Sequence, residues 1–473
     1  MPIATTVRPH ASPPTYAVIA AFIVIVALML GRLWWLPAHA SLNINEGWNA
    51  THALRALGNG DLYPPVEALV ANNYPPLSFF IVGWMGRILG DALIAGRLLS
   101  LAAQFATGAA VCVLVRRLVP DRRWTVLAAI VFGGYSATLL RPYLGMNDPQ
   151  WLGHAAMSWA LVVLMPREAG ERTTPGRLVA AAALIIAGGL IKHNLVAIPA
   201  AVTLWLFITD RRRFALWAGA LASMAIAAAG ALFAVWETAV FVDVLAPARS
   251  YSLARMAAKG GPLLLALLPV LIAARSLWSA ARNDSRLLLP LILLIVAVPI
   301  GVVQRAGSGV VINAFFEAII AASIAAPVAL ARYRTPRTGW IALTLLPVLC
   351  LVPSAAIADV REFAGRDAAE ARAVPFIRAI AAAKGAVACD DQAICYWAGR
   401  ESAIDFFSVN QRLLQGDARA LVPTLDRGEI ALIQMRGSNP GWRENRLLPA
   451  IHARYRVVYR DGGDELLSPG RGG

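Results

Sequence analysis

The sequence predicts an all-α polytopic membrane protein of about 11 transmembrane helices, followed by a small C-terminal α/β region. Of the 473 residues, 58% are hydrophobic and only 15% are charged, whereas soluble proteins carry about 25% charged residues. Apolar runs of roughly 15–23 residues alternate with short arginine-rich loops, which is typical of helical membrane proteins. After residue 360 the apolar runs shorten to strand length, which indicates a second region of different architecture.

The formal net charge of +15 could indicate either nucleic-acid binding or a membrane topology. The basic residues lie in the loops between apolar runs and do not gather on one soluble face. Since loops rich in lysine and arginine stay on the cytoplasmic side of a membrane, topology accounts for most of the excess. The pattern argues against nucleic acid as a partner and places the N-terminus in the cytoplasm.

The N-terminal segment is the first element to interpret. Residues 1–14 are polar and proline-rich, and we expect them to be disordered. The first apolar run covers residues 16–35, and Ala38-His39-Ala40 after it resembles a signal-peptidase site. Because the apolar core of a signal peptide has only about 7–15 residues, we predict an uncleaved first transmembrane helix, with cleavage as the alternative.

The later apolar runs form a consistent topology when the arginine-rich loops are placed inside the cell. The predicted spans after the first are residues 91–115, 124–140, 151–165, 178–191, 195–208, 214–236, 262–278, 287–303, 310–331 and 340–360. Residues 76–90 are also apolar, but the run is shorter than the roughly 20 residues that spanning requires. We predict a re-entrant or interfacial helix there.

The chain divides into a transmembrane domain, residues 1–360, and a small α/β domain outside the cytoplasm, residues 361–473. Strand-length runs at 385–389, 430–435 and 455–459, helical patterns at 368–383 and 410–426, and a turn at 461–464 predict this second domain. It contains Cys389 and Cys395, between which a disulfide is permitted outside the cytoplasm. A metal site is the less favoured interpretation, since no other cysteine or histidine lies close in sequence.

Ionisable residues at membrane depth are energetically expensive, so each is a candidate for function. In the predicted topology nearly all of them lie on the external side. The external segment 38–75 holds Asn45 and Glu46 beside Trp48 and ends at Tyr74. The remaining candidates on this side are Asp148, His154, Lys192, His193, Arg249, Arg255 and Lys259. A few acids facing several bases at one membrane surface suit an anionic, lipid-linked substrate.

Each candidate also has a structural interpretation. Asp148 precedes Pro149 and could cap the helix that begins there, an alternative as strong as a site role. On an apolar helix face, His154 is more often a packed core residue than a ligand. Lys192 and His193 could extend their charges to the membrane surface, but they separate two runs too short to span cleanly, which favours a place in a cavity wall.

Three motifs follow one another in the first part of the chain. They are Asn45-Glu46-Gly47-Trp48-Asn49-Ala50, Asn73-Tyr74-Pro75-Pro76-Leu77 and Gly96-Arg97-Leu98-Leu99-Ser100. In this order they resemble the GT-C superfamily of polyprenyl-phosphate-dependent glycosyltransferases. Within it the chain is similar to the bacterial branch related to protein O-mannosyltransferases and the lipid A aminoarabinose transferase. The similarity covers residues 16–213 well and the later helices by their layout.

The resemblance implies transfer of a sugar from a polyprenyl-phosphate donor to a hydroxyl of a lipid, glycan or protein acceptor, normally with inversion. It also implies the periplasmic face of a bacterial inner membrane. The predicted base is Glu46, because a carboxylate can take the proton of the attacking hydroxyl, and Asp148 is a second acidic site residue. The leaving phosphate needs no general acid, and cations stabilise its charge.

The predicted substrate-binding residues share a polar or cationic side chain on the external side. They are Lys192, His193, Arg249, Arg255, Lys259, Tyr74, Asn45 and His154. No cofactor and no metal ligand are predicted, and whether a divalent metal assists stays open. No aspartate-rich nucleotide-sugar motif stands out in an internal loop, which favours a lipid-linked donor.

Two positions depart from the pattern of the superfamily. Asn45 stands where its members usually carry the catalytic aspartate, and Tyr74 replaces a lysine that precedes Pro-Pro in the aminoarabinose transferases. Three interpretations stay open: Glu46 is the base, Asp148 is the base, or the protein has lost transfer. Functions of another class are a lipid-linked-glycan flippase or transporter, which should show internal repeats, and a catalytically silent lipid- or glycan-binding protein.

Overall fold

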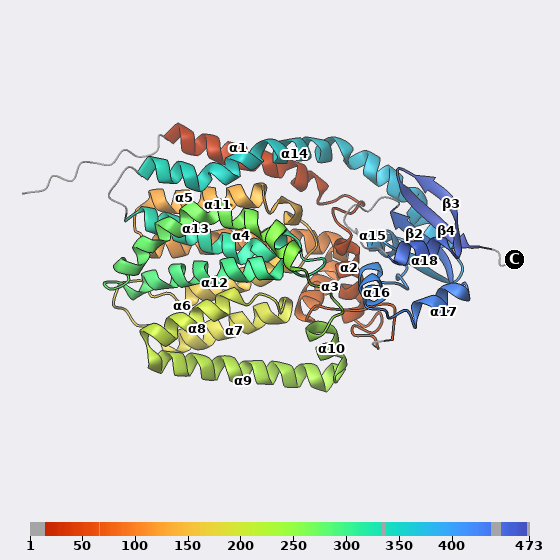
Figure 1. Ribbon diagram of the computed structural model, residues 1–473, viewed down its shortest axis with the longest axis horizontal. Coiled ribbons are helices and arrows are strands. Elements are labelled where there is room, and N and C mark those ends of the chain that lie inside the picture. Colours follow the sequence, from red (N-terminus) through yellow and green to blue (C-terminus); the bar gives the residue numbers. More distant parts are fainter. Residues whose placement is uncertain (1–14, 66, 333–336, 437–445, 471–473) are drawn as a thin grey trace, which may run out of the picture.

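A computed structural model describes residues 15–65, 67–332, 337–436 and 446–470 (Figure 1). Long helices form a bundle, and a mixed α/β region lies at one end of it. We call this end the domain end. The segment 1–14, which we predicted to be disordered, lies outside the described residues.

A helix occupies each of the predicted spans. These helices are α1 (Thr15–Trp35), α4 (Ala92–Leu118), α5 (Arg122–Ala137), α6 (Gln150–Leu164), α7 (Pro175–Ile191), α8 (Ala197–Thr209), α9 (Arg211–Trp236), α11 (Leu253–Ala280), α12 (Leu288–Gln304), α13 (Phe316–Leu330) and α14 (Arg337–Ala382). By length and composition, seven helices in the described part of the chain can cross a bilayer. The multi-pass helical architecture is therefore confirmed, while the number of about 11 spans stays a prediction.

Side-chain caps and a buried central helix organise the bundle. Asp91 accepts hydrogen bonds from two backbone N–H groups at the start of α4, and Asp121 and Asp210 cap α5 and α9. At the centre lies α13, in which every residue is buried, packed against α4, α5, α11 and α12. Because α13 is surrounded by protein, it can be apolar on all sides.

Three shorter helices lie at the domain end: α2 (Asn45–Ala56), α3 (Leu77–Leu89) and α10 (Ala239–Leu245) (Figure 1). The first lies in the external segment 38–75, for which no helix was predicted. The second matches the short helix predicted at 76–90. Short 3₁₀ turns join other helices: η1 (Arg141–Tyr143), η2 (Ser285–Leu287) and η3 (Ile312–Phe315).

The last membrane helix continues without interruption into the C-terminal region. Helix α14 has 46 residues, or roughly 70 Å at 1.5 Å per residue. The boundary predicted after residue 360 and the separate helix predicted at 368–383 both fall within it. Arg141 pairs with Asp359 at 3.2 Å and with Glu362 at 2.9 Å, which ties α14 to the η1 turn.

The C-terminal region contains a four-stranded mixed sheet in the order β1-β2-β4-β3. Its strands are β1 (Ala386–Cys389), β2 (Ile430–Arg436), β3 (Tyr455–Asp461) and β4 (Asp464–Pro469), and its helices are α15 (Gln392–Trp397), α16 (Phe406–Leu414), α17 (Leu421–Asp426) and α18 (Leu447–His452). Strands β1 and β2 are parallel, and β4 is antiparallel to both of its neighbours. The predicted turn is confirmed, since Gly462 and Gly463 join β3 to β4 with positive φ.

Two elements of this region differ from the prediction. The helical pattern at 410–426 is split between α16 and α17, because Gly416 between them has φ of 86°. Strand β4 was not predicted, since only three of its residues, Glu465 to Leu467, are buried.

Candidate active site

Glu46 lies in the first turn of α2, and its carboxylate is fully buried. Arg97 of α4 donates from Nε to Oε1 at 2.9 Å and from Nη2 to Oε2 at 2.7 Å. The backbone N–H groups of Asn147 and Leu42 donate to the same two oxygens, at 2.9 and 2.7 Å. Each carboxylate oxygen thus accepts two hydrogen bonds, which leaves no free position for a substrate proton.

Arg97 also fixes the chain that precedes α2. Its Nη1 and Nη2 atoms donate to the backbone carbonyls of Trp35, Leu36, Ala38 and Ala40 at 2.7–3.3 Å. The arginine is fully buried at the start of α4, where its donors meet both the carboxylate and the end of α1. This geometry suits a positioning role for the Glu46–Arg97 pair, and the catalytic use of Glu46 stays a prediction.

Asn147 joins Glu46 to the second candidate carboxylate. Besides its backbone bond to Glu46, its Nδ2 donates to the Glu46 carbonyl at 3.0 Å, and its carbonyl accepts from Asn49 Nδ2 at 2.9 Å. A Cβ on Gly96 would lie 1.8 Å from Asn147 Oδ1, so only glycine leaves room for this side chain. The residue that follows, Asp148, is therefore held at a fixed place relative to α2.

Asp148 pairs with Lys192, and both side chains are almost completely buried. Asp148 Oδ1 accepts from Lys192 Nζ at 3.0 Å and from the backbone N–H of Gln150 at 2.8 Å. The second oxygen, Oδ2, has no hydrogen-bond partner among the described residues. Lys192 is placed here because α7 ends at Ile191 and the chain turns toward α8.

Lys192 also contacts Tyr74, which ends the external segment. The Lys192 ammonium lies 3.4 Å from the Tyr74 hydroxyl and 4.5 Å from the centre of its ring. The Tyr74 ring is 5.2 Å from that of Trp48, edge to face, and its carbonyl accepts from the Tyr63 hydroxyl. The structure thus brings together Glu46, Asp148, Lys192 and Tyr74 in one polar chain that begins at Arg97.

Three other predicted residues lie beside this chain. Asn45 is half-buried in the first turn of α2, and its carbonyl accepts from Asn49 Nδ2 at 2.9 Å. His154 is buried against Phe316, with ring centres 5.3 Å apart, and contacts Gln150 at 2.9 Å, which is a packed core position. Burial, with the charges of neighbouring cations, lowers the pKa of His193 to about 4. His193 is therefore neutral near pH 7 and supplies no permanent cation.

The three predicted basic residues between positions 249 and 259 differ in their surroundings, and Arg255 and Lys259 lie on α11. Arg249 lies against Gly307 and makes no ion pair among the described residues; its Nε is buried without a partner there. Arg255 donates to the carbonyl of Ala306 at 2.8 Å. Lys259 is exposed on α11. Of the three, Arg249 also lies near enough to His193 for its charge to lower the pKa of that residue.

The C-terminal region packs directly on α2. Trp48 Nε1 donates to Asp405 Oδ2 at 3.1 Å, and the Ser41 hydroxyl donates to Asp391. Burial raises the pKa of both aspartates. A Cβ on Gly47 would lie 1.9 Å from the backbone nitrogen of Ala393. The contact is therefore close enough to exclude any side chain at position 47.

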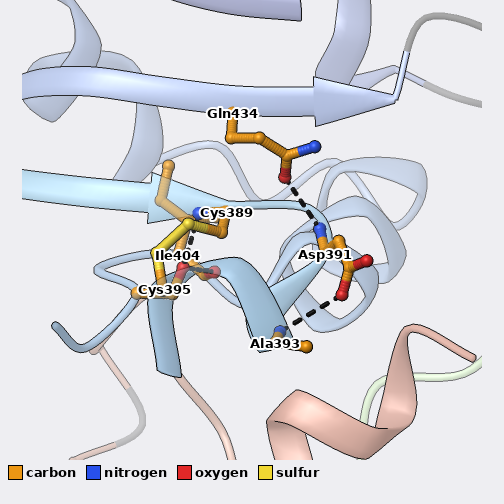
Figure 2. Close-up of a disulfide and its surroundings, with 7 residues drawn as sticks. Cys389, Asp391, Ala393, Cys395, Ile404 and Gln434 are labelled. Carbon is orange, nitrogen blue, oxygen red and sulfur yellow. Dashed lines mark hydrogen bonds between the residues drawn. A yellow bond between two sulfur atoms is a disulfide. The ribbon is translucent and has the colours of Figure 1, made fainter. Parts of the chain in front are cut away.

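A disulfide between Cys389 and Cys395 holds the segment that makes this contact (Figure 2). It joins the end of β1 to α15, whose first turn is capped by Asp391 through the Ala393 N–H at 3.1 Å. Gln434 Oε1 accepts from the Asp391 backbone N–H on the other side. The permitted disulfide is thus formed in the structure, at the surface that α2 contacts.

Sequence reasoning missed the residues that connect the predicted ones. Arg97, Asn147 and Asn49 carry most of the hydrogen bonds of the polar chain, and only Arg97 and Asn49 lay in a motif. An arginine within an apolar helix was the available signal for Arg97. Among the described residues, no group of three or more His, Cys, Asp or Glu side chains could hold a metal ion.

Comparisons with solved structures identify the fold. ArnT from Cupriavidus metallidurans in the apo state is 15% identical, with a TM-score of 0.60, covering 96% of this chain and 98% of that one. The same protein bound to undecaprenyl phosphate is 14% identical, with a TM-score of 0.60, covering 97% and 99%. The archaeal oligosaccharyltransferase AglB from Archaeoglobus fulgidus, in complex with an inhibitory peptide and a dolichol-phosphate, is 11% identical, with a TM-score of 0.54, covering 97% and 74%.

No protein-family model matches the chain, and neither does any curated protein sequence. At these low identities the likeness to ArnT and AglB concerns the fold. The chain shares the fold of these two proteins over almost its whole length, with its C-terminal region included.

Proposed function

We propose that the protein is a membrane glycosyltransferase that moves a sugar from a polyprenyl-phosphate donor to a hydroxyl acceptor, with Asp148 as the base. One observation carries the proposal: Asp148 is held through one oxygen by Lys192, while its other oxygen has no partner among the described residues. The carboxylate is thus oriented and still able to accept a proton. The undecaprenyl phosphate bound by ArnT and the dolichol-phosphate of the AglB complex support the donor class.

The chemistry requires one bond to form and one to break at the anomeric carbon. The acceptor oxygen attacks this carbon and gives its proton to Asp148, a step worth about 10²–10⁴-fold in rate. The bond from the anomeric carbon to the phosphate oxygen breaks, and polyprenyl phosphate leaves with inversion. Its charge is stabilised by Lys192, which lies between Asp148 and Tyr74, and by Arg249.

Glu46 has a different task in this proposal. One of the four hydrogen bonds to its carboxylate comes from the Asn147 backbone, and the Glu46 carbonyl accepts from Asn147 Nδ2. These contacts fix Asn147, and Asn147 in turn fixes Asp148, so Glu46 is a positioning residue. The C-terminal region supports the same arrangement by holding Trp48. We place this site at the periplasmic face of a bacterial inner membrane, since the arginine-rich loops belong to the opposite side.

A second candidate is a catalytically silent protein that binds a lipid phosphate. The observation that favours it is the chemistry of position 45, where an amide replaces the superfamily's aspartate, together with the ion pairs that hold Glu46 and Asp148. Such a protein would bind polyprenyl phosphate without consuming a sugar donor.

Release of polyprenyl phosphate from a panel of polyprenyl-phosphate sugars, measured with purified protein in detergent, separates the two. We expect release with the wild type and a loss of about 100-fold or more in Asp148→Asn, with binding of polyprenyl phosphate retained. Asp61→Asn is the matched control, because Asp61 is an exposed carboxylate on the same external segment. Binding without release across the panel would establish the silent protein, and full activity of Asp148→Asn would exclude this base.

A further inference from the structure

A small cavity with both polar and apolar lining residues lies beside Asp148. Its volume is about 10 Å³, and residues of α2, α3, α4, α6 and the segment before α6 line it. Four of these residues carry a buried side-chain oxygen that has no partner among the described residues: Asn49 Oδ1, Ser78 Oγ, Ser100 Oγ and Asp148 Oδ2. Unpaired polar atoms are unfavourable in a protein interior, so four around one cavity indicate an occupant.

The orientation of two of these groups is fixed by their other contacts. Asn49 Nδ2 donates to the carbonyls of Asn45 and Asn147, both at 2.9 Å, so its amide cannot be reversed and Oδ1 is left as an acceptor. Asp148 Oδ1 is occupied by Lys192 and Gln150, which leaves Oδ2. The cavity therefore offers two oxygens that only accept and two serine hydroxyls that can donate.

We propose that this cavity is a binding site for one water molecule. Water donates two hydrogen bonds and accepts two, which matches a wall of two acceptors and two hydroxyl donors. The water donates to Asp148 Oδ2 and Asn49 Oδ1 and accepts from Ser78 and Ser100. The volume of the cavity also suits one water molecule, since a cavity needs about 10–15 Å³ of free space to hold one.

A metal cation fits the same oxygens less well. The Asp148 charge is already balanced by Lys192 at 3.0 Å, so a cation would bring uncompensated positive charge among buried side chains. The group also contains only one carboxylate, whereas hard cations are usually held by more charged oxygen ligands. Charge therefore selects a neutral ligand.

Through the water, Asp148 Oδ2 is linked to Asn49 of α2, Ser78 of α3 and Ser100 of α4. The water holds the second carboxylate oxygen as Lys192 holds the first, and it leaves one lone pair of Oδ2 for a substrate hydroxyl. This consequence for catalysis rests on the proposed function, while the water site itself does not. Ser78 and Ser100 are thus positioning residues that act on Asp148 through the water.

Two measurements test the proposal. A structure of the full chain, at a resolution that shows buried waters, should contain a peak at about 2.7–3.2 Å from Asp148 Oδ2 and from at least one serine hydroxyl. The double variant Ser78→Ala/Ser100→Ala should lower kcat roughly ten-fold and leave KM unchanged, because its lost water orients the base and not the substrate. Ser158→Ala is the matched control, since its hydroxyl is also buried without a partner but lies outside the cavity.

The outcomes separate this proposal from the proposed function. An empty cavity, or a peak at the roughly 2.0–2.4 Å of a cation ligand, overturns the water site. A double variant that matches Ser158→Ala in both kcat and apparent Tm overturns it as well. A wild type that consumes no donor but shows the water peak disproves the enzyme and retains the site.

Discussion

Removal of the Arg97 side chain tests whether Glu46 positions the site or accepts the proton itself. Arg97→Met would leave the Glu46 carboxylate buried, without two of its four donors and without its counter-charge. Glu46→Gln would also be unfavourable here, because each carboxylate oxygen accepts from two N–H groups. The glutamine NH₂ group would replace one of these oxygens, and it would then point its own hydrogens at two N–H groups that need an acceptor.

The size of the effect follows from the burial of the pair. Breaking a fully buried ion pair by removing one partner destabilises a protein by about 3–5 kcal/mol. We expect the apparent Tm to fall by on the order of 5 °C or more in each single variant. In Glu46→Gln/Arg97→Met both charges are gone, so the loss of stability should be smaller than the sum of the two single losses by at least about 1 kcal/mol.

Thermal unfolding in detergent, followed by tryptophan fluorescence, measures these differences, and donor consumption is assayed well below the lowest apparent Tm. Arg282→Met is the control, since Arg282 is exposed and lies outside the site. The positioning role predicts that stability and transfer decline together in Glu46→Gln. If Glu46→Gln abolishes transfer at an unchanged apparent Tm, Glu46 is the base and the reasoning from its four hydrogen bonds is wrong.

Three other features give testable expectations. Gly47→Ala should separate α2 from α15 and make the C-terminal region sensitive to limited proteolysis, because the new methyl would overlap the backbone of Ala393. Burial raises the pKa of Asp243 to about 6. An acid with a raised pKa stabilises the fold when it is protonated, so the apparent Tm should fall as the pH rises from about 4 to about 7. The fall should be smaller in Asp243→Asn, which cannot titrate at this position. Arg249→Ala should raise KM for the lipid donor about ten-fold, since it removes a charged hydrogen-bond donor.

Each expectation has a control or a contrary outcome. Gly189→Ala adds a methyl that meets no atom within 4 Å, so it should be as resistant to proteolysis as the wild type. If Gly47→Ala is equally resistant, α2 and α15 are not in close contact. Equal pH slopes of apparent Tm in wild type and Asp243→Asn would contradict the titration of Asp243. An unchanged KM in Arg249→Ala would remove this arginine from donor binding.

The membrane helices could be predicted because an apolar run is a local property of the sequence. Helix α2 could not, since its segment is mostly polar and its stability depends on contacts with Asp405 and Ala393 that lie far away in sequence. The continuity of α14 was hidden for another reason. Pro347, Pro353 and Pro375 lie inside it, and proline usually marks the end of a helix.

The members of the site were easier to predict than their pairing. Glu46, Asp148 and Lys192 stand out because each is charged beside apolar runs. Which cation meets which acid depends on helix packing: Arg97 is 51 residues from Glu46, and Lys192 is 44 residues from Asp148. Polarity therefore indicated where chemistry could lie, and only the fold distinguishes a saturated carboxylate from one with a free oxygen.

The charges of the polar chain balance in pairs, and this determines what a bound donor can use. Glu46 with Arg97 and Asp148 with Lys192 sum to zero, a balance that the neutral amide of Asn45 preserves. A lipid phosphate brings negative charge, so it needs a further cation or it attracts Lys192 away from Asp148. The second event would remove the counter-charge of Asp148 and make this carboxylate a stronger base when donor is bound. Lys192→Met should then lose both transfer and donor binding, whereas Asp148→Asn should lose transfer alone; equal donor binding in the two variants would show that Lys192 never leaves Asp148.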